Sequence, residues 1–75
     1  MMGRQDIERL GFTVVATTKF ADGVSFDAHY TGSAVKRFMV RGPRGRDYDR
    51  AMDSLYTHCV INGERKGVFS ESEAV

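Results

Sequence analysis

Between residues 41 and 50 the sequence reads RGPRGRDYDR, which places three arginines and two glycines directly before a predicted helix and a fourth arginine in its first turn. A glycine-rich loop that opens a helix is one way to bind phosphate, because the free N–H groups of the first turn point at the anion. This stretch lacks the P-loop order and the dinucleotide-binding spacing. Asp47 and Asp49 also fall in the first helical turn, where their carboxylates satisfy the N–H groups and repel a phosphate.

We therefore predict that these arginines are solvated and partly paired with neighbouring carboxylates. Exposed ion pairs of this kind contribute about 0–1 kcal/mol each. The alternative is a functional arginine cluster that holds phosphates from outside the helix end, or an acidic partner. The arginines are Arg41, Arg44, Arg46 and Arg50, and the carboxylates are those of Asp47, Asp49 and Asp53.

The histidines and the single cysteine are not spaced as a catalytic or metal-binding site requires. Adjacent helical residues point about 100° apart, so His58 and Cys59 do not form a catalytic pair, and Cys59 is expected to be a buried core thiol. His29 lies two residues from Asp27 on one strand face, which is a common arrangement on exposed sheets. Two histidines and one cysteine without CxxC or HxxxH spacing predict no metal site. We expect a non-enzymatic protein with no cofactor and no small-molecule substrate.

Composition predicts one small domain over residues 1–75, with a mobile acidic tail at about 70–75. The net charge is +1, so no overall basic field attracts nucleic acid or anionic lipid. A single cysteine excludes an internal disulfide. Apolar runs of three or four residues are too short to cross a membrane, and the N-terminus lacks a signal-peptide core, so we expect a cytoplasmic protein without membrane contact.

The elements that must position these residues begin with a helical turn in QDIERLGF, with Gly11 as a left-handed stop. Residues 12–20 are a predicted strand because they are rich in β-branched and aromatic residues, and residues 24–30 because they alternate in polarity. In the first strand Phe12, Val14, Ala16, Thr18 and Phe20 share one face. A two-residue loop at Asp22-Gly23 would put the two apolar sets on opposite faces, whereas a three-residue loop at 21–23 pairs Phe20 with Val24. We predict the three-residue loop.

A third strand is predicted in SAVKRFMVR, residues 33–41. A loop over residues 31–33 places Phe38 beside Phe26 and Val40 beside Val24, whereas a loop of Gly32-Ser33 alone turns Met39 and Val35 toward the core. The first choice gives the better cross-strand pairs. The outer face of the sheet is then expected to carry Thr13, Val15, Thr17, Lys19, Asp27, His29, Arg37 and Met39.

A long helix is predicted from the N-cap Asp47 to Asn62-Gly63. Its apolar stripe lies at spacings of four, three and four and consists of Tyr48, Met52, Leu55 and Cys59, widened by Ala51 and Tyr56. A further short strand is expected around Val68 and Phe69. The predicted fold class is α+β, with a three-stranded antiparallel meander, the C-terminal helix packed on one face and a short N-terminal helical turn. Phe26, Phe38, Met52 and Leu55 are expected at the centre of the core.

The order of helix, three strands and helix resembles the double-stranded-RNA-binding domain, in which a basic cluster opens the second helix. Arg44, Arg46 and Arg50 occupy the corresponding region, but Asp47 and Asp49 interrupt the charge and the lysine-rich motif of that family is missing. In size and layout the chain also resembles small phage-encoded proteins that inhibit or redirect a host machine, such as RNA polymerase, a nuclease or a CRISPR complex. That resemblance implies an inhibitor or modulator of a larger complex.

The residues and this resemblance together favour a protein-binding module, with a nucleic-acid-binding domain as the alternative. A mixed charge set suits a protein surface, because both signs then contribute to specificity and association rate. The predicted partner-binding residues are Arg41, Arg44, Arg46, Arg50, Arg37 and Lys19.

Overall fold

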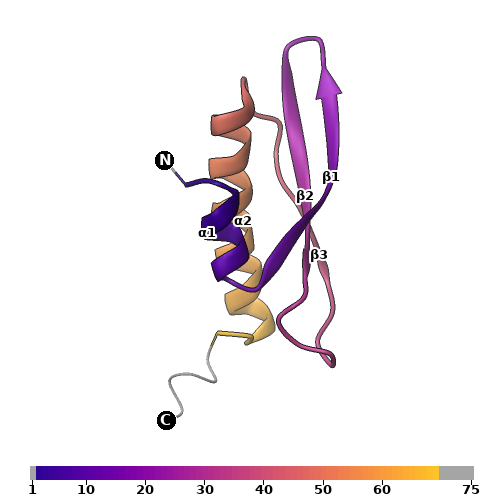
Figure 1. Cartoon of the computed structure of the whole chain (residues 1–75), viewed down its shortest axis with the longest axis vertical. Helices are drawn as coiled ribbons and strands as arrows, with labels where there is room; N and C mark the ends of the chain where they lie inside the picture. The colour runs from indigo at the N-terminus through magenta and orange to yellow at the C-terminus, as the bar shows by residue number, and fades with distance from the viewer. Residues whose placement is uncertain (1, 70–75) are drawn as a thin grey trace.

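The computed structural model describes residues 2–69 and has the predicted α+β architecture. Three antiparallel strands form a sheet in the order β1-β2-β3, and the long helix α2 lies along one face of it (Figure 1). The short helix α1 packs beside α2 and the start of β1. The elements are α1 (Arg4–Arg9), β1 (Phe12–Phe20), β2 (Gly23–Tyr30), β3 (Met39–Arg41) and α2 (Tyr48–Lys66). No helix within residues 2–69 has the length and apolar character needed to span a membrane.

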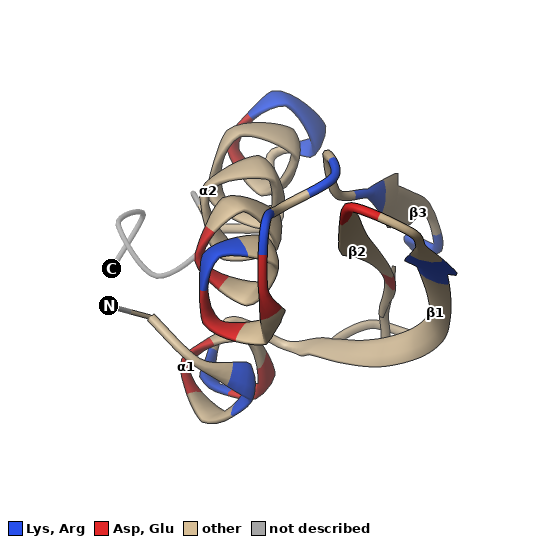
Figure 2. Cartoon of the chain, turned by 90° about the horizontal axis from the view of Figure 1, so that it is seen from above, with Lys and Arg blue, Asp and Glu red and all other residues tan. Residues whose placement is uncertain are grey.

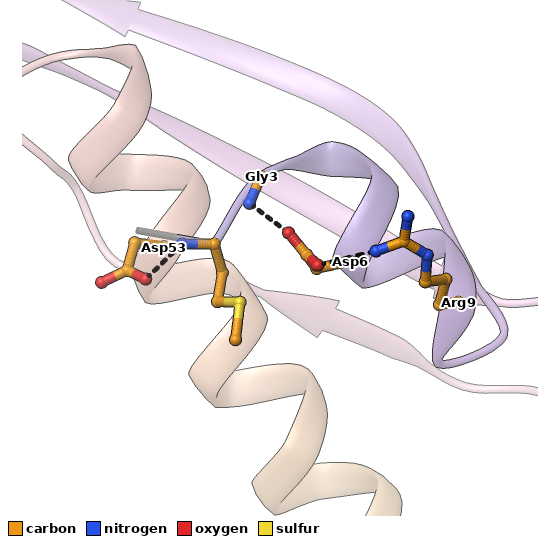
Figure 3. A network of polar contacts seen from close by, with 5 residues as sticks. Gly3, Asp6, Arg9 and Asp53 are labelled. Atoms are coloured by element: carbon orange, nitrogen blue, oxygen red, sulfur yellow. Dashed lines mark hydrogen bonds and ion pairs between the residues drawn. The ribbon is translucent and has the colours of Figure 1, made fainter.

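Local capping and a tertiary contact with α2 together hold the six-residue helix α1, which is too short to be stable alone. The Asp6 carboxylate accepts a hydrogen bond from the Gly3 N–H at 2.9 Å and pairs with Arg9 at 3.1 Å. The Met2 N–H donates to Asp53 of α2 at 3.0 Å, so the start of the described chain is attached to the long helix (Figure 3). Gly11 has a φ of 99°, which confirms the predicted left-handed stop.

The β1–β2 hairpin turns earlier than predicted. Phe20 pairs with Gly23, so the loop is the two residues 21 and 22 rather than 21–23, and Lys19 rather than Phe20 pairs with Val24. Our predicted register was therefore wrong by one residue at the tip.

A β-bulge at Val15 explains how this register keeps the core apolar. The pairing shifts between Val14 and Ala16, so one extra residue enters β1 and everything after it changes face. Phe12 and Val14 face the core opposite Tyr30 and Ala28.

Beyond the bulge, Ala16, Thr18 and Phe20 lie on the outer face. The side chains of Thr17 and Lys19 lie on the inner face, opposite Phe26 and Val24. The prediction that the first strand keeps one apolar face was therefore wrong beyond Val14. The prediction that Thr17 and Lys19 lie on the outer face was wrong for the same reason.

The third strand is shorter than predicted and shifted along β2. It spans only Met39–Arg41, and Val40 pairs with Ala28 rather than lying beside Val24. The predicted choice of face is confirmed, since Val40 is buried while Met39 is exposed. Phe38 is only partly buried, and it stacks on Tyr30 with ring centroids 5.2 Å apart rather than lying beside Phe26.

Helix α2 begins as predicted and ends later. The Asp47 carboxylate accepts a hydrogen bond from the Arg50 N–H at 2.9 Å, which confirms Asp47 as the N-cap. The helix continues through Asn62 and Gly63 to Lys66, where Gly67 with a φ of 72° closes it, so the predicted end at Asn62-Gly63 was wrong. Tertiary packing overrides the low helix propensity of an Asn-Gly pair here, because Gly63 is buried against the Phe69 ring.

The remaining differences concern the chain end and the helix stripe. Residues 67–69 form a turn rather than the expected strand, with the Val68 N–H donating to the Gly63 carbonyl at 3.0 Å. Tyr48, predicted on the buried stripe, is 53% exposed. Phe26, Met52 and Leu55 lie in the core as predicted. The predicted mobile tail at 70–75 lies outside the described residues.

Candidate functional site

The glycine- and arginine-rich stretch continues the third strand along β2 and does not form a phosphate cradle. The Gly42 N–H donates to the Phe26 carbonyl at 2.9 Å. Gly45 and Val24 exchange two backbone hydrogen bonds, at 2.9 and 2.8 Å. The N–H groups of both glycines are therefore already used, and the Asp47 carboxylate occupies the start of α2.

Arg44 holds the tip of the hairpin. Its guanidinium pairs with the Asp22 carboxylate at 2.8 Å, and its central carbon lies 3.7 Å from the centroid of the Phe20 ring. Together these contacts join the tip to the segment that precedes α2. The expected pairing of the arginines with nearby carboxylates is found for Arg50 and Asp47, at 3.8 Å, whereas Arg44 pairs across the fold.

The six predicted partner-binding residues do not form one patch. Figure 2 shows the cationic segments distributed over β1, β3 and the start of α2 rather than gathered on one face. Arg41 lies on the outer face beside Asp27, Arg37 lies in the connection before β3, and Arg50 lies in the first turn of α2. Only Lys19 and Arg46 converge, since both line one groove.

That groove lies between the inner face of the hairpin and the N-terminal end of α2, and we call it the hairpin groove. It has a volume of about 730 Å³ and is open to solvent. Its floor is apolar, because Val24 and Phe26 face it. The Tyr48 ring packs edge-on against the Phe26 ring, with the two ring centroids 5.2 Å apart. The lining residues are Thr17, Lys19, Phe20, Ala21, Asp22, Gly23, Val24, Phe26, Arg46 and Tyr48.

The two cations of the hairpin groove have no ionic partner within the described part of the chain. Lys19 and Arg46 are exposed, and neither forms an ion pair with any residue from 2 to 69. Asp22, the one acidic residue of the lining, is already paired with Arg44. The groove therefore combines an apolar floor with two positive charges that have room for an anion.

The outer edge of β1 forms the rim of the same groove. β1 lies at the edge of the sheet, and its residues 15–20 are all exposed. In β2, Val24, Phe26 and Tyr30 direct backbone groups at the third-strand side. Because neighbouring residues of a strand alternate in this respect, the odd-numbered residues of β2 bond to β1.

The partners of these odd-numbered residues fix which groups of β1 point outward. Ser25 and Asp27 pair with Thr18 and Ala16, so the N–H and C=O groups of Thr17 and Lys19 point away from the sheet. In the described chain no strand lies on that side of β1.

The histidines and the cysteine form no catalytic arrangement in the described region. The His58 Nδ1 atom lies 3.0 Å from the Ser54 carbonyl of its own helix rather than near Cys59. His29 lies on the outer face, opposite Thr13 and Met39. Among residues 2–69 no group of three His, Cys, Asp or Glu side chains is placed to hold a metal ion.

We expect Cys59 to react slowly with a thiol reagent while the protein is folded. Its side chain is fully buried, and desolvation raises the pKa of the thiol to about 12. The thiolate is the reactive form. At pH 8 the rate of labelling should therefore be limited by unfolding of the protein, whereas denatured protein should be labelled within minutes. Time-resolved labelling with a chromogenic disulfide checks this, and equally rapid labelling of the folded protein would contradict a core position.

The fold is α+β, but no relative identifies the chain. Comparison with family models, with curated proteins and with solved structures finds no match.

Sequence reasoning missed the hairpin groove because it missed the bulge. With an unbroken alternation Lys19 lies on the outer face, and the groove has only one cation. The pattern carried one indication: Phe12 and Val14 are apolar, while Thr17 and Lys19, which share their face in the structure, are polar. A change of polarity within one strand is what a half-covered face produces.

Proposed function

We propose that this protein is a small protein-binding module that uses the end of the β1–β2 hairpin as its contact surface. One observation supports this most directly: residues 15–20 of β1 are exposed and end the sheet without a neighbouring strand in the described chain. A long exposed edge is a liability that proteins usually cover or shorten. An edge that is kept open beside a partly apolar groove is suited to a partner. That this partner belongs to a larger macromolecular complex, whose action the module inhibits or modulates, is part of the same proposal.

The distribution of charge supports a protein partner over a nucleic acid. Affinity for a phosphate backbone depends on several cations that follow one track. Here Arg44 and Arg50 are paired with Asp22 and Asp47, and Arg41 lies beside Asp27 on a different face from Arg46. A protein surface can use such a mixed arrangement, because complementary potentials need both signs.

Site-specific photo-crosslinking tests this function. A photoreactive amino acid is placed at Thr18, on the exposed hairpin, and in a separate protein at Arg65, an exposed residue in the last turn of α2. We expect the hairpin position to yield a discrete protein adduct in lysate that survives nuclease treatment. Adducts of equal yield from Arg65, or an adduct that nuclease removes, would contradict the proposal, and the second result would favour nucleic-acid binding.

We expect Arg46→Glu to lower the yield of that adduct about tenfold, because reversing an interfacial charge leaves a partner's acid facing another acid. Arg46 is a sharper choice than Arg44, whose contacts with Asp22 and Phe20 hold the hairpin tip. Arg65→Glu carries the same charge change at the other end of α2 and should leave the yield unchanged. A thermal melt of each variant checks that the fold persists, and an undiminished yield from Arg46→Glu would contradict a role for this cation.

A further inference from the structure

The outer edge of β1 offers a short row of backbone hydrogen-bonding groups. The N–H and C=O groups of Thr17 and Lys19 point outward, while their side chains face the hairpin groove. An extended peptide that pairs with such an edge receives its affinity from main-chain hydrogen bonds. Its specificity comes from the pockets that receive alternate side chains.

The hairpin groove determines what those alternate side chains should be. A strand laid against β1 directs every second side chain toward the inner face. Beside Thr17 that side chain extends over Thr17 toward the apolar floor of the hairpin groove, where Phe26 and the Tyr48 ring lie, and this floor favours an apolar group. The side chain two residues further along the added strand lies beside the Lys19 ammonium and faces the Arg46 guanidinium. Neither of these groups has an ionic partner within residues 2–69.

We propose that β1 receives an extended segment of a partner protein as a fourth strand, and that the groove face of this segment carries an apolar residue followed two positions later by an acidic one. The inference rests on the proposed function and names the chemistry by which the partner is recognised. The hairpin provides a rigid template, because the segment from Gly42 to Gly45 already pairs with the other edge of β2.

A second copy of this chain is a less suitable occupant. Lysine on an edge strand discourages edge-to-edge association, and β1 contains no acidic residue that would meet the Lys19 and Arg46 of a neighbour. An acidic partner strand makes the same lysine an attractive contact. The positive charge of Lys19 on the edge strand thus acts against self-association and at the same time favours an acidic partner segment.

The test uses four blocked seven-residue peptides. The first alternates threonine with a leucine and two glutamates, so that leucine and glutamates share one face. The second replaces both glutamates by lysine. The remaining two keep the first sequence but carry N-methyl groups on alternate amides along one edge. They differ in which edge is methylated, so that only one of these two N-methylated versions is unable to donate hydrogen bonds to β1.

We expect the glutamate peptide to bind the folded protein in calorimetry and to protect the backbone amides of Thr17 and Lys19 from hydrogen exchange. The lysine peptide and one N-methylated version should each bind at least about tenfold more weakly. Equal binding of both N-methylated versions and the unmodified peptide would overturn strand addition, and equal binding of the lysine peptide would overturn the assigned acid. Protection of the same two amides without peptide, together with a dimer in sedimentation, would assign the edge to a second copy.

Two variants locate the binding on the protein. Thr17→Pro removes an outward N–H group, which an edge strand tolerates because no hydrogen bond of the sheet is lost. The variant should bind the glutamate peptide about tenfold more weakly, or more weakly still. The double variant Lys19→Glu/Arg46→Glu should reverse the preference in favour of the lysine peptide, a gain that a merely unfolded variant cannot show. Retained preference for the glutamate peptide in the double variant would overturn the proposal.

These experiments separate the inference from the function on which it rests. A nuclease-resistant adduct at the hairpin without binding of the glutamate peptide means that the protein-binding function stands and strand addition is wrong. Absence of an adduct at the hairpin contradicts the function itself, whatever the peptides do.

Discussion

Leu55→Ala is expected to lower the free energy of unfolding by about 2–5 kcal/mol. Leu55 is fully buried at the centre of α2, where it packs against the sheet and the Gly42 segment. Truncation removes buried methyl groups and leaves a cavity, which adds to the lost transfer free energy of those groups. A domain of this size has a net stability of about 3–5 kcal/mol, so the substitution should remove most of that stability.

Chemical denaturation monitored by circular dichroism measures this effect. Ile61→Ala is the matched control, because it shortens an aliphatic side chain on the same helix at a position that is 43% exposed. Its cost should stay below about 1 kcal/mol. If Leu55→Ala unfolds at the same denaturant concentration as Ile61→Ala, α2 does not pack on the sheet through this residue.

Gly45→Ala is expected to have the second largest effect on stability. A Cβ atom at this position would approach the backbone nitrogen of Ala51 in α2, and on this side the nearest atoms belong to the helix rather than to a mobile side chain. Overpacking of this kind costs about 1–3 kcal/mol. We expect a value near the upper end, because relief requires the segment to move away from α2 and to lose its two hydrogen bonds with Val24.

Gly63→Ala is a control with a different obstacle. The added Cβ meets the ring of Phe69, a side chain that can rotate, and alanine is favoured over glycine in a helix by about 0.5–1 kcal/mol. Thermal melts should therefore place Gly63→Ala above Gly45→Ala. The Gly45→Ala variant should also bind the glutamate peptide more weakly, since Gly45 positions Arg46 beside the hairpin groove. The opposite order of melting temperatures would show that the segment yields more easily than this packing implies.

Local chemistry in the sequence determined much of the fold. The β-branched and aromatic residues of 12–20 and the alternating polarity of 24–30 predicted the two long strands, and the structure has them within one residue of those bounds. Asp47 was recognisable as an N-cap because its carboxylate serves an N–H group only three residues away. The stripe of Met52, Leu55 and Cys59 predicted the buried side of α2. In each case the residues that decide the structure are close neighbours in the chain.

Tertiary structure alone decided the candidate site. A period of two indicates which residues share a face, but it does not indicate where an extra residue enters, and the bulge at Val15 moves Lys19 from the outer face into the hairpin groove. The sequence grouped Arg44 with Arg46 as one cluster. The structure separates them, because Arg44 reaches Asp22 across the fold while Arg46 lines the groove. Both outcomes depend on which distant backbone covers the edge of β2, and hydrogen bonds between segments about twenty residues apart leave no local pattern in the sequence.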